Sequence, residues 1–236
     1  MQVKLVSTTH SLIKEKPLTA EELIVYTARV SNPSNQMNTE SSDRLIAYLI
    51  RNKHWSPFEM VDMTVEIVTS RAIAAQILRH RSFSFQEFSQ RYAEVTEMEP
   101  VQIRKAGSTN RQSSTEEFDP ILEIDCMGSH DGVYFPASGE ASAIISDHLD
   151  WCQALYKSLL AAGAAKEVAR MVLPLTTQTT IYMKGSVRSW IHYLQIRCDE
   201  HTQLEHRQVA MAVLDLFKAQ FPNISKALFG DADQKG

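Results

Sequence analysis

The chain has 236 residues, of which 44% are hydrophobic and 22% charged, with a formal net charge of −4 at pH 7. This composition is ordinary for a globular protein of one large or two small domains. The sequence lacks a run of about 18 apolar residues, which excludes a transmembrane helix. The acidic balance does not favour broad nucleic-acid binding, which usually needs a basic face.

The N-terminal sequence MQVKLVSTTH has no charged segment followed by an apolar one, so we expect no secretory signal. The three cysteines, Cys126, Cys152 and Cys198, are widely spaced and odd in number. They form neither a disulfide framework nor a CxxC metal pattern, and they fit a reducing compartment. The sequence therefore predicts a cytoplasmic protein without a membrane span.

Short structured segments and loops alternate at the start of the chain. Residues 1–7 are predicted to form a strand, and Thr19 with Glu22 has the spacing of a capping box that begins a helix. Residues 31–39 are polar and contain a proline, which indicates a loop. A second amphipathic helix is predicted over residues 43–53.

Residues 61–67 alternate between apolar and polar side chains, which predicts a half-buried strand. Ser70 can cap the helix that follows, RAIAAQILRHR. That helix is expected to carry Arg79, His80 and Arg81 at its C-terminal end, and the following SFSFQEF is expected to be a connecting segment.

Residues from about 97 to 138 are polar, rich in serine and threonine, and without periodicity. This pattern predicts a long, partly ordered insertion, which we interpret as a flap or rim near a site because long loops in compact domains are usually functional or mobile. A long helix is then predicted from about Glu140 to Ala162, with Gly163 as its C-cap.

The last third of the chain is mainly helical. The predicted elements are a short helix in AAKEVARMVLP, a strand in TTQTTIYMKG, and helices in SVRSWIHYLQIRCDE and TQLEHRQVAMAVLDLFKAQF. The fold class predicted is α+β, a single domain over residues 1–236 with several helices packed on a small, mainly antiparallel sheet. Without a strand–GxGxxG–helix unit, a dinucleotide-binding βαβ domain is not expected.

Positive charge is concentrated beside aromatic rings in RHRSFSFQEFSQRY, residues 79–92. Cations at a helix C-terminus are favoured by the helix dipole, which alone explains the first three residues. An arginine-rich loop with hydroxyl donors is also suited to a phosphate, and Gln76 on the preceding turn could read a base edge. A solvated helix end, a nucleic-acid patch and a small-anion site all fit at this point.

Arg188, His192 and Arg197 lie on one predicted helix, where Arg188 and Arg197 are half a turn out of phase. One straight helix cannot direct both arginines into the same pocket, so either one of them only caps the helix or the helix lies between two sites. His201 and His206 are five residues apart without an HExxH pattern, which disfavours a metal-dependent hydrolase; no metal site is expected.

Several ordered motifs resemble the flavin-dependent thymidylate synthases. The signature of that family, Arg-His-Arg followed after seven residues by serine, reads RHR-SFSFQEF-S here and continues as Ser89-Gln90-Arg91-Tyr92. The resemblance extends to TARVS, HWSPFE, EVARMVLPL and RSWIHYLQIRCDEHTQ. It covers most of the chain outside residues 97–138.

The resemblance implies reductive methylation of dUMP to dTMP, with methylenetetrahydrofolate as one-carbon donor and FAD, reduced by NADPH, as hydride carrier. It implies a homotetramer with active sites between subunits. Residues that match flavin-contacting positions are Ser56, Arg79, His80, Arg81, Glu87, Ser186, Arg188 and His192. Residues that match dUMP-binding positions are Gln76, Arg79, Glu87, Ser89, Gln90, Arg91, Arg170 and Arg197.

Arg197 matches the arginine that stabilises the ionised N3 of the pyrimidine, so it is the predicted catalytic residue. The chain departs from the family at Gln86, where asparagine is common, and His192 occupies a variable position. The alternative to this enzyme is a nucleotide- or RNA-binding module without catalysis that uses the same basic and aromatic stretch.

Overall fold

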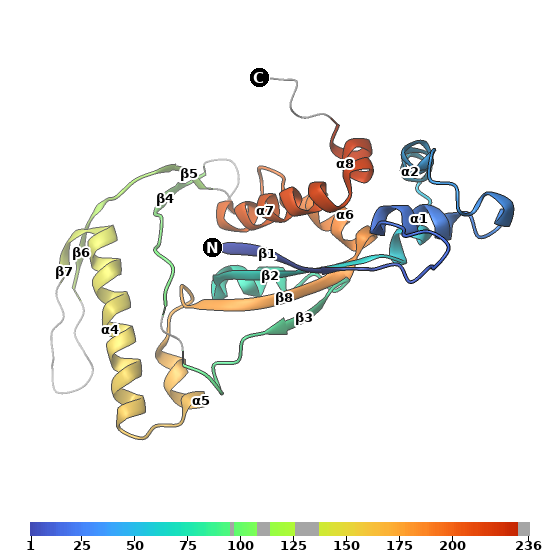
Figure 1. Ribbon diagram of the computed structural model, residues 1–236. Helices are drawn as coiled ribbons and strands as arrows, with labels where there is room; N and C mark the ends of the chain where they lie inside the picture. The colour runs from blue at the N-terminus through green and yellow to red at the C-terminus, as the bar shows by residue number, and fades with distance from the viewer. Residues whose placement is uncertain (95–96, 108–113, 126–136, 231–236) are drawn as a thin grey trace. The chain divides into compact units, whose positions relative to one another are not determined.

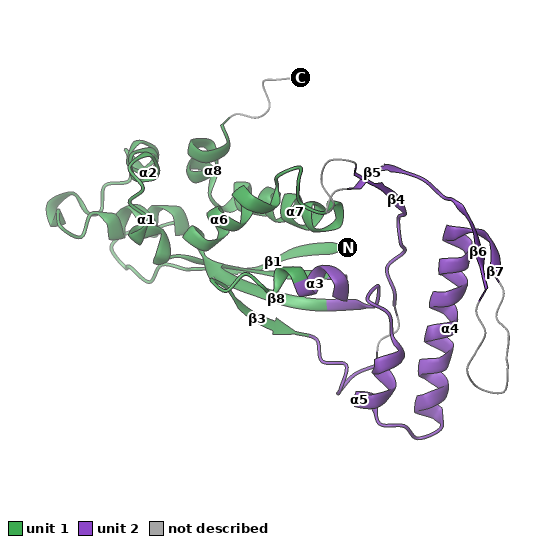
Figure 2. Cartoon of the chain, turned by 180° about the vertical axis from the view of Figure 1, so that it is seen from behind, with its two compact units in different colours: residues 1–68, 76–87, 180–236 green, residues 69–75, 88–179 purple. Residues whose placement is uncertain are grey.

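A computed structural model describes residues 1–94, 97–107, 114–125 and 137–230 (Figure 1). The chain divides into two compact units, which Figure 2 colours separately. Unit 1 comprises residues 1–68, 76–87 and 180–236, and unit 2 comprises residues 69–75 and 88–179. Compact units within a chain need not be independent domains, so the single domain stays a prediction. Within the described ranges, no helix is both long and apolar enough to cross a membrane.

The centre of unit 1 is a four-stranded sheet with the strand order β1-β2-β8-β3. Its strands are β1 Gln2–Thr8, β2 Asp62–Ser70, β8 Gln178–Ser186 and β3 Ser84–Glu87, of which β2 and β8 each extend into unit 2 by two residues. β1 is antiparallel to β2, and β3 is antiparallel to β8. The alternation predicted for β2 is confirmed, since Met63, Val65 and Ile67 are fully buried.

Helices of unit 1 complete its core. They are α1 Ala20–Ala28, α2 Ser42–Arg51, α6 Val187–Arg197, α7 Leu204–Gln220 and α8 Pro222–Phe229, with the short 3-10 helices η1 Pro33–Asn35 and η2 Ser56–Glu59. Figure 1 shows α6 and α7 along one face of the sheet. Trp190 of α6 is fully buried and its indole Nε1 donates a hydrogen bond of 2.9 Å to the Met63 carbonyl. Each large apolar side chain buried here stabilises the fold by about 1.5–3 kcal/mol.

The capping box predicted at the start of α1 is confirmed. Thr19 Oγ1 accepts from the Glu22 amide at 3.1 Å, and the Glu22 carboxylate accepts from the Thr19 amide at 2.8 Å. The neighbouring carboxylate of Glu21 is buried and accepts from Asn223 Nδ2 and the Ile224 amide, both at 2.8 Å. Glu21 therefore satisfies a free amide at the start of α8, a helix that the sequence analysis does not predict. Burial of the Glu21 carboxylate raises its pKa.

The segment SFSFQEF is not a plain connection, because Ser84–Glu87 form β3 at the edge of the sheet. Phe83 enters the core just before this strand. Its ring meets Trp190 edge-on at 4.7 Å between centroids and lies 5.9 Å from Tyr193. A Cβ atom at Gly185 of β8 would lie only 2.5 Å from Phe83 Cδ1. Phe83 is therefore a packing residue that fixes the start of β3 against the core.

Unit 2 consists of a long helix with smaller elements around it. They are α4 Ala141–Ala161, α5 Lys166–Ala169, η3 Arg170–Val172, β4 Arg104–Ala106, β5 Ser114–Glu117, β6 Ile121–Ile124 and β7 Ala137–Glu140. α4 confirms the long predicted helix, and Gly163 behind it has φ +89°, as a C-terminal cap requires. At the other end of α4, Asp119 accepts from the Ser142 amide at 2.8 Å.

Part of the predicted insertion, at residues 108–113 and 126–136, lies outside the described residues. The described part is more regular than the sequence predicts, since β4 pairs with β5 and β6 with β7, both antiparallel. The strands are short and largely exposed, as the side chains of Ile121 and Ile124 illustrate. Because neither hairpin has a continuous apolar face, period-two patterning is absent from the sequence.

Candidate functional site

The Arg-His-Arg motif lies in a turn rather than on a helix. The predicted helix RAIAAQILRHR is shorter than expected, because the helix observed there, α3, spans only Arg71–Ile77. Two i to i−3 hydrogen bonds continue the chain, from the Arg79 amide to the Gln76 carbonyl at 3.3 Å and from the His80 amide to the Ile77 carbonyl at 3.1 Å. The turn leaves Arg79 and Arg81 exposed and directs His80 partly into the protein.

His80 is held in one protonation state by its neighbours. Its ring meets Tyr193 edge-on at 4.9 Å, and its Nε2 lies 3.0 Å from the Nε of Arg197. A guanidinium only donates, so His80 Nε2 accepts and the neutral ring carries its proton on Nδ1. Burial, followed by the charges of Arg197 and His192, lowers the His80 pKa from 6.5 to about 4. A neutral His80 thus orients Arg197 without neutralising its charge.

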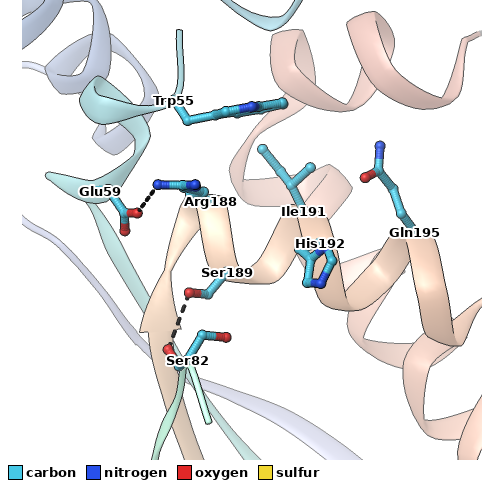
Figure 3. Close-up of a pocket in the computed structure, with 8 residues that line it drawn as sticks. All are labelled: Trp55, Glu59, Ser82, Arg188, Ser189, Ile191, His192 and Gln195. Carbon is cyan, nitrogen blue, oxygen red and sulfur yellow. Dashed lines mark hydrogen bonds and ion pairs between the residues drawn. The ribbon is translucent and has the colours of Figure 1, made fainter. Parts of the chain in front are cut away.

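A pocket of about 370 Å³ lies next to this turn (Figure 3). Its walls come from the η2 region, the Arg-His-Arg turn and α6, and the lining residues are Trp55, Glu59, Ser82, Arg188, Ser189, Ile191, His192 and Gln195. Figure 3 shows Trp55 facing α6 across the pocket, with Ser82 below Ser189. Ser189 Oγ donates to the Ser82 carbonyl at 3.2 Å, which ties α6 to the turn.

Charge in the pocket comes from Arg188 and Glu59. Arg188 Nη1 lies 2.9 Å from Glu59 Oε1, and Ser186 Oγ donates to the other Glu59 oxygen at 2.5 Å. Both charged side chains are more than one-third exposed, so the pair contributes at most about 1 kcal/mol. An anionic ligand can therefore displace Glu59 from Arg188 at low cost. Ser186 also caps α6 by accepting from the Ser189 amide at 3.3 Å.

The pocket fits a flavin by the chemistry of its lining. Trp55 offers an aromatic wall, Arg188 a cation, and Ser82 and Ser189 hydroxyl groups, near the N-terminal end of α6 where free amides favour an anion. Of the residues predicted to contact flavin, Arg188 and His192 line the pocket. Trp55, Glu59, Ser82, Ser189, Ile191 and Gln195 line it without having been predicted, although Trp55 and Glu59 belong to the HWSPFE motif.

The other predicted flavin and dUMP residues of unit 1 include members of η2, β3 and α3. Ser56 is the exposed first residue of η2, directly after Trp55. Glu87 ends β3, opposite Ile181 of β8. Gln76 lies on the last turn of α3, where its amide contacts Gln203, the N-cap of α7, at 2.7 Å and His206 of α7 at 3.3 Å.

Four predicted dUMP residues belong to unit 2. The carbonyl of Ser89 accepts from the Tyr92 amide at 3.1 Å, which closes a turn with Arg91 exposed beside the Tyr92 ring. Gln90 in this turn is buried, and its Nε2 has no hydrogen-bond partner in the described structure. A buried amide without a partner suits a site completed by a ligand.

The helix α5, which directly precedes Arg170, contacts residues next to this turn. Lys166 Nζ donates to the Tyr92 carbonyl at 3.4 Å and pairs with Glu94 at 3.4 Å. Arg170 Nε donates to the Glu167 carbonyl at 3.2 Å. Arg170 therefore belongs to the same unit as the Ser89–Arg91 turn, while Gln76, Arg79, Glu87 and Arg197 belong to unit 1.

Comparison with known proteins decides the family. Residues 11–223 match the family model described as thymidylate synthase complementing protein. A flavin-dependent thymidylate synthase from Synechocystis sp. is 48% identical over 97% of this chain and 99% of the relative. A probable flavin-dependent thymidylate synthase from Paramecium bursaria Chlorella virus 1 is 47% identical over the same shares.

The chain belongs to the flavin-dependent thymidylate synthase family. The fold agrees, since the crystal structure of a UMP/dUMP methylase, PolB, from Streptomyces cacaoi bound with 5-Br dUMP superimposes with a TM-score of 0.72. That comparison covers 97% of this chain and 94% of the other at 24% identity. The family, the α+β fold class and the enzyme class predicted from the sequence are confirmed. Among the described residues, no three His, Cys, Asp or Glu side chains group to hold a metal.

Proposed function

We propose that the enzyme converts dUMP to dTMP, with methylenetetrahydrofolate as one-carbon donor and FAD as hydride carrier, reduced by NADPH. Family membership supports the reaction. The structural observation that carries it is the arrangement around Arg197, whose guanidinium is oriented by the neutral ring of His80 beside the Arg-His-Arg turn. Arg197 forms no ion pair with any described carboxylate, so its charge is available to a substrate.

FAD would be held by the α6 pocket and the turn beside it. Arg188, Ser189 and His192 offer polar contacts there, with Trp55 as the aromatic wall. Arg79 and Arg81 are exposed cations on the adjoining turn. When bound, FAD supplies the hydride that completes the methyl group. The residues of the chain bind, orient and exclude water around that group.

The chemistry of dUMP fits the remaining candidates. Its phosphate needs cations and amides, which Arg91, Arg170 and the partnerless Nε2 of buried Gln90 would provide. Its uracil needs a positive charge, because ionisation at N3 raises the electron density at C5. Arg197 is charged at all physiological pH values, so it would favour that ionised form.

We infer a homotetramer in which sites form between subunits. Arg188 and Arg197 stand at the two ends of α6 and have different partners, Glu59 and His80. This separation supports an α6 that serves two sites. The cytoplasmic location and the role of residues 97–138 as a flap stay predictions. Unchanged folate and dUMP affinities after deletion of residues 97–138 would contradict a flap.

The proposed function is tested by the flavin spectrum. Purified enzyme should be yellow, should bleach with NADPH, and should recover its colour with methylenetetrahydrofolate only when dUMP is present. Colourless protein that cannot be reconstituted with FAD would refute the proposal.

The role of Arg197 is tested by substitution. Arg197→Ala should lower kcat by about 100- to 1,000-fold, the usual loss when a group that stabilises developing charge is removed. Its flavin affinity should change little. Arg197→Lys is the matched control, because it keeps a cation but removes the Nε donor to His80. Loss of flavin with intact dUMP binding in Arg197→Ala would show that the role is misassigned.

A further inference from the structure

His206 is a fully buried histidine that the proposed mechanism does not use. It lies on α7, 130 positions from Gln76 in the sequence. Its Nε2 lies 3.1 Å from the hydroxyl of Tyr193 on α6, and its Nδ1 lies 3.3 Å from Oε1 of Gln76 on α3. The histidine thus joins three helices beneath the Arg-His-Arg turn.

Both Tyr193 and His206 are neutral. Burial raises the pKa of the Tyr193 phenol, so the phenol keeps its proton. Burial, then the electrostatic effect of the neighbouring Arg197 and His80, lowers the His206 pKa to about 4. A neutral imidazole has one donor and one acceptor nitrogen, so its tautomer depends on what Gln76 presents to it.

The orientation of Gln76 follows from a carboxylate at the far end of a chain of contacts. Glu205 only accepts, so Gln203 turns its Nε2 toward Glu205 Oε2, at 2.9 Å. The Gln203 carbonyl therefore faces Gln76 at 2.7 Å and requires a donor, which is Gln76 Nε2. A flipped Gln76 would place two carbonyl oxygens 2.7 Å apart.

The remaining protons are then fixed in turn. With its Nε2 toward Gln203, Gln76 presents Oε1 to His206, so His206 Nδ1 donates. His206 Nε2 accepts, and Tyr193 donates to it. Every donor in the series Tyr193, His206, Gln76, Gln203 points toward Glu205. This relay consumes the carbonyl of Gln76 and one of its two N–H groups.

We propose that Tyr193 and His206 position Gln76 so that its second N–H is presented as a donor to an oxygen of the nucleotide substrate. The assignment rests on the proposed function, because Gln76 is among the residues expected to bind dUMP. His206 is a positioning residue that acts through Gln76. The oxygen belongs either to the phosphate or to a uracil carbonyl, and both accept a hydrogen bond from the same N–H.

The relay is tested by two substitutions at one position. His206→Leu removes both hydrogen bonds with little change in volume, whereas His206→Asn keeps a donor near the place of Nδ1. In the holoenzyme, His206→Leu should raise the KM for dUMP by about three- to tenfold, the worth of one neutral hydrogen bond, without lowering FAD affinity. His206→Asn should restore most of that loss.

A double-mutant cycle separates positioning from general stability. In a Gln76→Ala background, His206→Leu should have no further effect on the KM for dUMP, since the donor is already gone. An effect that persists in that background, or equal losses in His206→Leu and His206→Asn, would overturn the relay. Tyr193→Phe, which removes the donor to His206 Nε2, gives a second variant if His206→Leu folds poorly.

Binding assays with dUMP and deoxyuridine show which oxygen of the nucleotide accepts the Gln76 N–H. They also separate failure of the relay from failure of the proposed function. Binding of deoxyuridine, which lacks the phosphate, should be weakened by His206→Leu if the N–H meets the uracil and unaffected if it meets the phosphate. Wild-type enzyme that binds no dUMP overturns the proposed function and the assignment together. Normal dUMP binding by the wild type and by both His206 variants overturns the relay alone.

Discussion

Gly185→Ala should destabilise the enzyme through a single ring. The added Cβ would lie 2.5 Å from Cδ1 and 2.6 Å from Cε1 of Phe83, distances at which something must move. Phe83 is 9% exposed and its ring is confined by Trp190 and Tyr193, so it cannot move without loss of those contacts. Overpacking of this kind costs about 1–3 kcal/mol.

A smaller effect of opposite sign accompanies this cost. Replacing glycine by alanine restricts the unfolded chain and stabilises by about 0.4–1 kcal/mol where the backbone allows it. Gly185 has no left-handed φ, so its strand conformation accepts alanine. The net loss expected for Gly185→Ala is therefore about 0–2.6 kcal/mol. Urea unfolding at one fixed protein concentration measures it.

Phe83→Ala provides the matched control. Alone it should cost about 3–5 kcal/mol, as for other buried phenylalanines. With the ring removed, Gly185→Ala should no longer destabilise, so the double variant should be more stable than the sum of the single effects predicts, by about 1–3 kcal/mol. Additive effects would refute the close approach. Since the Phe83 amide donates to the His80 carbonyl, Gly185→Ala should also weaken flavin binding.

Two further predictions concern pH and assembly. His206 has a pKa of about 4 in the folded state, against 6.5 for the ordinary side chain. Between these pH values the unfolded state therefore binds one proton more at this histidine than the folded state does. The contribution of the neutral, buried His206 to stability is complete above pH 6.5 and is lost as the pH falls toward 4. The free energy of unfolding should therefore fall less steeply from pH 7 to pH 5 in His206→Leu, by up to about 1.4 kcal/mol per pH unit, and parallel curves would contradict the lowered pKa. The assembly is tested by mixing Arg188→Ala and Arg197→Ala subunits after mild dissociation. If each site takes these two arginines from different subunits, about one quarter of the activity at most should return. No recovery of activity would place both arginines of a site in one subunit.

Sequence patterns predicted the elements whose signals are local. Alternation in β2, the capping box of Thr19 and Glu22, and α4 with Gly163 behind it all depend on residues close together in the chain. Such signals do not require knowledge of the partner element. The Arg-His-Arg motif and its surrounding candidates were found for a related reason, because the family motifs are contiguous stretches of sequence.

Elements defined by distant partners escaped prediction. β3 is a strand because it pairs with β8, almost a hundred residues away. Its own sequence is short and has polar residues at both ends, so it resembles a loop. The hairpins between residues 97 and 140 have no apolar face to reveal them. From the sequence alone His206 suggests only a metal ligand, since its partners Tyr193 and Gln76 lie on other helices. A contact 130 positions away leaves no periodic trace in the sequence.

The reaction proposed for this chain is the methylation of dUMP with a flavin as its redox cofactor. Its most direct test is the amount of dTMP formed from dUMP, methylenetetrahydrofolate and NADPH by the FAD-loaded enzyme, with each component omitted in turn. We predict dTMP in the complete mixture and none when FAD, folate or NADPH is left out. Formation of dTMP by the flavin-free protein, or none by protein shown to carry FAD and to bind dUMP, would contradict the account.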